Sequence, residues 1–119
     1  MIRIWLAIAG LAGAASVAAG ALAAHLADDP KAAELLRTGA LYGMVHAAAF
    51  VAFIALAQGR RGTAVVAGWS FAVGIVLFSG SLFALAAGGA RWLGWVTPFG
   101  GVALIVGWAA LAILAFRRR

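Results

Sequence analysis

The chain has 119 residues, of which 66% are hydrophobic and only 10% are charged, with a formal net charge of +6. Soluble domains carry roughly one-half apolar and one-quarter charged residues, so this composition excludes an ordinary soluble domain and indicates a membrane protein. Cysteine is absent, which excludes disulfides and thiolate chemistry. The length allows one domain, and the basic residues lie between and beyond apolar runs, so they indicate membrane topology rather than nucleic-acid binding.

Four apolar segments are each close to the roughly 20 residues that a helix needs to cross a bilayer. They cover about residues 4–24, 40–58, 64–87 and 92–116, and none contains Lys, Arg, Asp or Glu. Backbone groups in lipid must be satisfied within the segment, and a barrel would need at least eight alternating segments of about ten residues. We therefore expect an all-α membrane protein, a four-transmembrane-helix bundle that forms one domain over residues 1–119.

The first segment also resembles a cleavable signal peptide. It has a basic start, an apolar stretch and small-residue sites such as Ala21-Leu22-Ala23. The apolar regions of signal peptides run to about 15 residues, whereas this one is close to a full span, so we expect it to be retained. Cleavage would leave a protein of three helices.

The connections carry helix-start signals. Asp29 can cap a helix whose first residue is Pro30, which predicts a short outer-surface helix between the first two spans. Its expected stop is Thr38-Gly39, or the turn runs straight into the second span. Thr97 followed by Pro98 is a further start signal, so the fourth span begins at either Trp92 or Thr97.

The distribution of basic residues predicts the orientation of the chain. In a four-span arrangement one side carries six of them (Arg3, Arg60, Arg61, Arg117, Arg118 and Arg119) and the other side three (Lys31, Arg37 and Arg91). Cytoplasmic loops are enriched in Lys and Arg, so both termini are expected in the cytoplasm. The acidic residues Asp28, Asp29 and Glu34 then fall in the first outer loop.

Six polar residues form the candidate polar cluster of this sequence: His25, Tyr42, His46, Ser79, Ser81 and Thr97. A rise of about 1.5 Å per residue along the predicted spans places all six in the outer half of the membrane. Ser79 and Ser81 are two residues apart, which turns them about 200° away from each other, so each is expected to bond a different neighbour. His25 and His46 lack further intramembrane ligands, so no metal site is expected.

Small residues predict close contacts between the helices. The expected packing positions are Gly39, Gly43, Gly74, Gly80, Gly100 and Gly101. Gly39, Tyr42, Gly43 and His46 follow a helical repeat, so this stripe is expected to face protein. Gly80, between the two serines, is expected to admit a close backbone.

Four short motifs occur in order: GALAAHL closing the first span, YGMVHA opening the second, FSGSLF in the third, and TPFGG followed by GW in the fourth. In this order and spacing they resemble the YgdD-like small membrane proteins, catalogued as domain of unknown function 423, whose eukaryotic relatives are called transmembrane protein 256. The resemblance covers nearly the whole chain and implies a four-helix bacterial inner-membrane protein without an established activity. The matched positions are Gly20, His25, Tyr42, His46, Phe78, Ser79, Gly80, Ser81, Thr97, Pro98, Gly100, Gly101 and Trp108.

Three classes of function are compatible with these residues. The first is a non-enzymatic structural or accessory bundle without a cofactor, which contacts lipid and associates with itself or with another membrane protein. The second is a small oligomeric transporter or channel for a proton, ion or small solute that uses His46, although no charged residue falls within a span. The third is an intramembrane serine hydrolase, although no oriented carboxylate or Gly-x-Ser-x-Gly turn accompanies Ser79 or Ser81.

Overall fold

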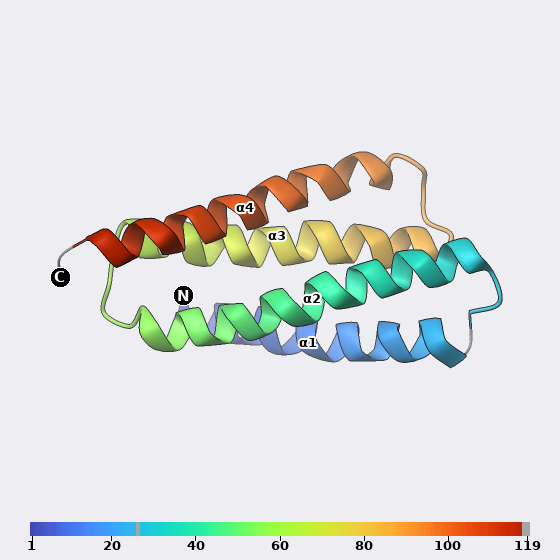
Figure 1. Cartoon of the computed structure of the whole chain (residues 1–119), viewed down its shortest axis with the longest axis horizontal. Coiled ribbons are helices and arrows are strands. Elements are labelled where there is room, and N and C mark those ends of the chain that lie inside the picture. The colour runs from blue at the N-terminus through green and yellow to red at the C-terminus, as the bar shows by residue number, and fades with distance from the viewer. Residues whose placement is uncertain (26, 118–119) are drawn as a thin grey trace.

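The structure, a computed structural model, describes residues 1–25 and 27–117. This part of the chain forms four α-helices, α1 (Ile2–His25), α2 (Pro30–Leu56), α3 (Thr63–Ala86) and α4 (Leu93–Phe116), which run alternately up and down (Figure 1). All four are long and apolar enough to cross a membrane. The predicted all-α bundle of four spans is confirmed.

The helices pack in chain order. The closest packing joins α3 to α4, α1 to α2 and α2 to α3, whereas α1 approaches α3 less closely, and the backbone of α4 approaches mainly that of α3. Both termini and the α2–α3 turn lie at one end of the bundle, here called the termini end (Figure 1). The other two connections lie at the opposite end, the far end, and the long axis measures 51 Å.

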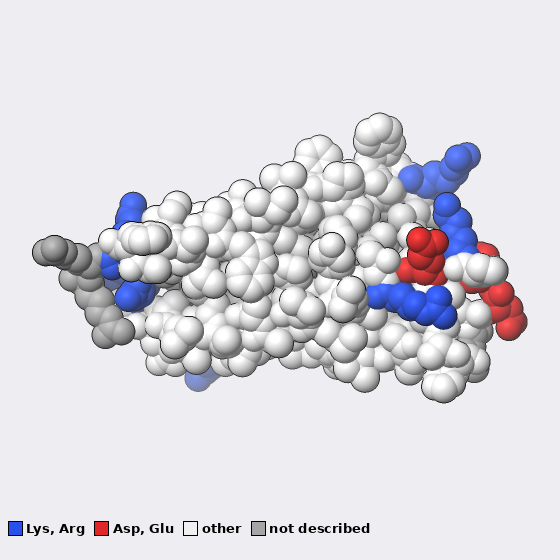
Figure 2. Space-filling model, viewed as in Figure 1, with Lys and Arg blue, Asp and Glu red and all other residues white. Residues whose placement is uncertain are grey.

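Charged side chains gather at the two ends of the bundle. Figure 2 shows a wide uncharged belt between them, with all visible acidic side chains at the far end. Arg3, Arg60, Arg61 and Arg117 belong to the termini end, and Arg118 and Arg119 lie outside the described residues. The uncharged belt follows from the absence of Lys, Arg, Asp and Glu in the spans, because lipid penalises unpaired charge.

An aromatic core fills the half of the bundle near the termini. Phe50, Phe53 and Phe71 are almost fully buried, and the ring of Trp5 packs on Phe50 and Phe53 at centroid distances of 5.9 and 6.2 Å. These side chains come from α1, α2 and α3, so the core joins three helices.

The expected short surface helix does not exist as a separate element. Asp29 caps α2 as predicted, because its carboxylate accepts the N–H of Lys31 at 3.1 Å and Pro30 is the first helical residue. However, α2 then continues through Thr38 and Gly39 into the second span, so the expected stop there is wrong. A helix that stops at a glycine commonly has that residue in the left-handed conformation, but Gly39 has no positive φ and is buried against α3.

The fourth span starts at the earlier of the two predicted positions. Trp92 precedes the first helical residue of α4, and Thr97 and Pro98 lie inside the helix, so the Thr97 start is wrong. Pro98 removes one hydrogen bond, to the carbonyl of Gly94. Gly94 is exposed near the helix end, where water can satisfy that carbonyl, and the helix continues through the proline.

Candidate functional site

His46 is the most enclosed ionisable side chain of the spans, with 7% of its surface exposed. Its Nδ1 lies 2.7 Å from the carbonyl oxygen of Tyr42, and its Nε2 lies 3.1 Å from the indole nitrogen of Trp108. A carbonyl only accepts and an indole N–H only donates, so Nδ1 carries the proton and Nε2 carries the lone pair. The neutral imidazole therefore uses both nitrogens, and a second proton on Nε2 would face the indole N–H.

Aromatic rings surround this imidazole. The ring of Tyr42 stacks on it at 5.8 Å, and those of Trp108 and Phe71 approach it at 6.0 and 6.5 Å. Trp108 comes from α4 and Phe71 from α3, so the group links three helices. Because the backbones of α2 and α4 scarcely approach each other, the hydrogen bond between His46 and Trp108 is a side-chain bridge across them.

The two serines of α3 face different helices, so their predicted separation is confirmed. The hydroxyl of Ser79 donates to the carbonyl of Gly39 in α2 at 2.7 Å. The hydroxyl of Ser81 donates to the carbonyl of Phe78 at 2.9 Å and lies 2.5 Å from the hydroxyl of Thr97 in α4. The imidazole of His46 is engaged elsewhere, so a serine and histidine pair for acyl transfer is not assembled.

A further serine, Ser16 of α1, belongs to this polar group and was not among the candidate residues. It is fully buried, and its hydroxyl has no hydrogen-bond partner among the described residues. A side chain built on Gly43 of α2 would collide with this hydroxyl and would lie 3.2 Å from that of Ser79. The sequence signal is the spacing of Ser16 from Gly13 and Gly20, which places them on one small-residue face of α1.

Most of the packing glycines lie where a neighbouring helix leaves no room for a side chain. A Cβ on Gly39 would lie 2.6 Å from the ring of Phe83, and one on Gly74 would lie 2.7 Å from Leu104. A Cβ on Gly100 would collide with the backbone of α3, whereas one on Gly101 would make ordinary contact with the ring of Phe78 at 3.7 Å.

Gly80 does not admit a close neighbour, so that expectation is wrong. A Cβ built there would have nothing within 4 Å. Gly80 lines an apolar groove of about 270 Å³ between α1 and α3. The physical reason is the order of packing, since α1 approaches α3 less closely than α2 and α4 do.

The depth of His46 also differs from the expected one. His46 follows the midpoint of α2, and it packs on Phe71, before the midpoint of α3, and on Trp108, beyond the midpoint of α4. All three therefore lie toward the termini end, so the prediction of a cluster confined to the outer half is wrong for His46. The cause is the early start of α2 at Pro30, which adds about three turns before the expected start.

His25 lies apart from the other candidate residues. It is the last residue of α1 at the far end, it is exposed, and it joins none of the side-chain hydrogen bonds found in residues 1–25 and 27–117. The structure therefore separates the two imidazoles between the halves of the bundle. Within the described residues, no group of three or more His, Cys, Asp or Glu side chains could hold a metal ion.

Two serine substitutions should have different effects on stability. Ser79→Ala removes the donor to Gly39 and should cost about 0.5–1.5 kcal/mol, which lowers the melting temperature. Ser16→Ala removes a buried hydroxyl that has no hydrogen-bond partner among the described residues, and it should be neutral or stabilising. Thermal unfolding of both variants in the same detergent, followed by circular dichroism, measures the difference. Equal losses would show that Ser16 has a partner as strong as that of Ser79.

The four helices are apolar and long enough to span a membrane, and their polar side chains form hydrogen bonds inside the bundle. These features define a small integral membrane protein that crosses the bilayer several times. The family model described as "Protein of unknown function (DUF423)" matches residues 19–101. The chain belongs to this family, as its motifs predicted. No solved structure is a significant match to it.

Bacterial relatives match nearly the full length of the chain. The UPF0382 inner membrane protein YgdD of Escherichia coli (strain K12) is 39% identical over 121 residues, which cover 97% of this chain and 91% of the relative. A UPF0382 membrane protein of Haemophilus influenzae is 36% identical, with 97% and 95% covered. The UPF0382 membrane protein YwdK of Bacillus subtilis is 34% identical, with 97% and 98% covered.

Proposed function

We propose that this chain is a non-enzymatic structural or accessory bundle whose internal polar side chains hold the helices in register. The observation that carries the proposal is that His46 uses one ring nitrogen in a contact with its own helix and the other in a hydrogen bond with Trp108 of α4. The hydroxyls of Ser79, Ser81 and Thr97 are likewise used in contacts between or within helices. None of them is left as a free nucleophile beside a base.

We also propose a place and partners for the bundle. The excess of Arg at the termini end supports a cytoplasmic location of both termini, and the relative YgdD is named an inner membrane protein. The proposed partners are the lipid bilayer and another membrane protein, either a second copy or a different chain. Gly10 of α1 and Gly80 of α3 support such association, because a Cβ on either would have nothing within 4 Å and small residues let helices approach closely in lipid.

Proton transport through His46 is the function that a direct experiment must separate from this proposal. A transported proton would have to bind Nε2, and it would break the bond to Trp108 each time. Full-length protein in proteoliposomes that contain a pH-sensitive dye should show no proton flux above that of empty liposomes. A fluorophosphonate probe should label neither Ser79 nor Ser81.

His25 supplies the matched control for this experiment, because it is exposed and makes no described side-chain hydrogen bond. Flux that survives His25→Ala but disappears in a folded His46→Gln variant would overturn the proposal in favour of transport. Labelling of either serine would overturn it in favour of a hydrolase.

A further inference from the structure

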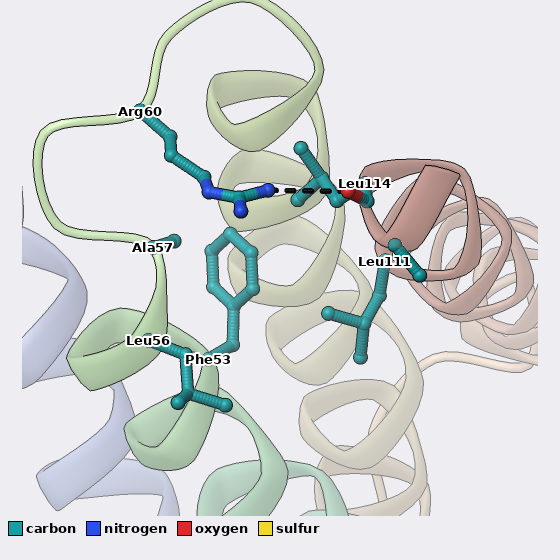
Figure 3. Close-up of a pocket in the computed structure, with 7 residues that line it drawn as sticks. Phe53, Leu56, Ala57, Arg60, Leu111 and Leu114 are labelled. Atoms are coloured by element: carbon teal, nitrogen blue, oxygen red, sulfur yellow. Dashed lines mark hydrogen bonds between the residues drawn. The ribbon is translucent and has the colours of Figure 1, made fainter. Parts of the chain in front are cut away.

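Arg60 stands at the mouth of an apolar pocket at the termini end of the bundle (Figure 3). The pocket has a volume of about 280 Å³ and lies between the C-terminal turns of α2 and α4. Arg60 belongs to the α2–α3 turn, and its guanidinium Nη1 donates to the carbonyl oxygen of Leu114 at 3.1 Å. The lining includes Phe53, Leu56, Ala57, Arg60, Leu111 and Leu114.

The guanidinium of Arg60 has N–H donors left to bind a ligand, and it keeps its positive charge. An arginine carries five N–H donors, and this one bonds Leu114 through a single nitrogen. The acidic residues Asp28, Asp29 and Glu34 belong to the far end, so within the described part of the chain no acidic side chain lies beside Arg60. Arg61 and Arg117 lie at the same end and add to the positive field around the pocket.

We propose that this pocket binds one anionic phospholipid, with an acyl chain between α2 and α4 and the phosphate on Arg60. The planar fork of a guanidinium matches phosphate oxygens, and clustered basic residues at a membrane surface attract anionic lipids. The apolar walls of Phe53, Leu56 and Leu111 match the acyl chain.

Charge selects this pocket over the larger one at the far end. That pocket has a volume of about 560 Å³, and Asp28 and Asp29 line it together with apolar residues of α1, α2 and α3. Its carboxylates would repel a phosphate, whereas the guanidinium of Arg60 attracts one. The groove beside Gly80 has only the hydroxyls of Ser16 and Ser79 as polar side-chain groups. An anionic headgroup therefore finds complementary charge at Arg60.

The test compares two neighbouring arginines. Native mass spectrometry of the full-length protein in a mild detergent, titrated with phosphatidylglycerol or phosphatidylcholine, counts the lipids that stay bound. Wild-type protein should retain one phosphatidylglycerol in preference to phosphatidylcholine. Arg60→Gln should weaken that binding by about tenfold, as expected for a lost charge-assisted hydrogen bond. Arg61→Gln removes the same charge one residue away, outside the pocket lining, and should keep the preferred lipid.

A second variant separates binding from folding. Leu111→Trp keeps Arg60 and fills the pocket, so it should also lose the lipid, and it decides the question if Arg60→Gln unfolds. The proposal would be overturned by equal loss in Arg61→Gln, by equal retention of both lipids by the wild type, or by full retention in a folded Leu111→Trp variant. A second copy of the chain bound in place of the lipid would also overturn it.

Discussion

Gly100→Ala should separate α4 from α3 and lower the melting temperature sharply. A Cβ on Gly100 would lie 2.8 Å from the Cα of Phe78 and 2.9 Å from the carbonyl carbon of Leu77, and closer still to the backbone nitrogen of Phe78. Backbone atoms cannot rotate away, so the helices themselves must move. Overpacking of this kind costs about 1–3 kcal/mol, and we expect the upper part of that range because the closest packing of α4 is against α3. Thermal unfolding in detergent, followed by circular dichroism, measures the loss.

Gly101→Ala is the matched control for this prediction. The added methyl group would make ordinary contact at 3.7 Å with the ring of Phe78. A methyl group added at Gly80 in a second control variant would meet nothing within 4 Å. Alanine has a higher helix propensity than glycine, so Gly101→Ala and Gly80→Ala should leave the melting temperature unchanged or slightly higher. An unchanged melting temperature in Gly100→Ala, or an equal loss in Gly101→Ala, would contradict the described packing of α3 on α4.

His46→Ala should produce the second large loss of stability, about 2–4 kcal/mol. The substitution empties the space between the rings of Tyr42, Phe71 and Trp108, and it leaves the indole N–H without its acceptor. His25→Ala removes an exposed imidazole at the far end and should have little effect. Reversible unfolding of both variants in mixed micelles gives the two free energies of unfolding.

A double-mutant cycle isolates the hydrogen bond within that loss. Trp108→Phe keeps an aromatic ring and removes the donor to Nε2, so on its own it should cost about 1 kcal/mol. The double variant should lose less than the sum of the two single losses, by about 0.5–1.5 kcal/mol. Additive losses would show that the two side chains do not interact. The bridge between α2 and α4 would then contribute nothing to the free energy of unfolding.

The location of the polar contacts explains how so apolar a chain acquires one packing arrangement. Aliphatic side chains alone permit many registers between helices, because lipid is as apolar as they are and does not drive the helices together. The bonds from Ser79 to Gly39, from Ser81 to Thr97 and from His46 to Trp108 tie particular turns of neighbouring helices to one another. A small number of internal hydrogen bonds thus fixes the register of α2, α3 and α4.

The amino-acid sequence by itself determined the number of spans, their helical nature and the cap at Asp29. It also determined that Ser79 and Ser81 form hydrogen bonds with different neighbours. These properties are local: the length of an apolar run, the preference of Asp and Pro for a helix start, and the rotation per residue of a helix. No knowledge of the other helices is needed to predict them.

Tertiary structure decided that α2 continues through Gly39 and which small residues are essential. Gly39 continues a helix because α3 covers it, and Gly80 is open because α1 stays further from α3 than the other neighbours do. The level of His46, its bond to Trp108 and the position of Arg60 over Leu114 likewise depend on how the helices pair and slide along one another. The rotation of a helix tells which face a side chain occupies, but only the packed neighbour supplies the atom that the side chain meets.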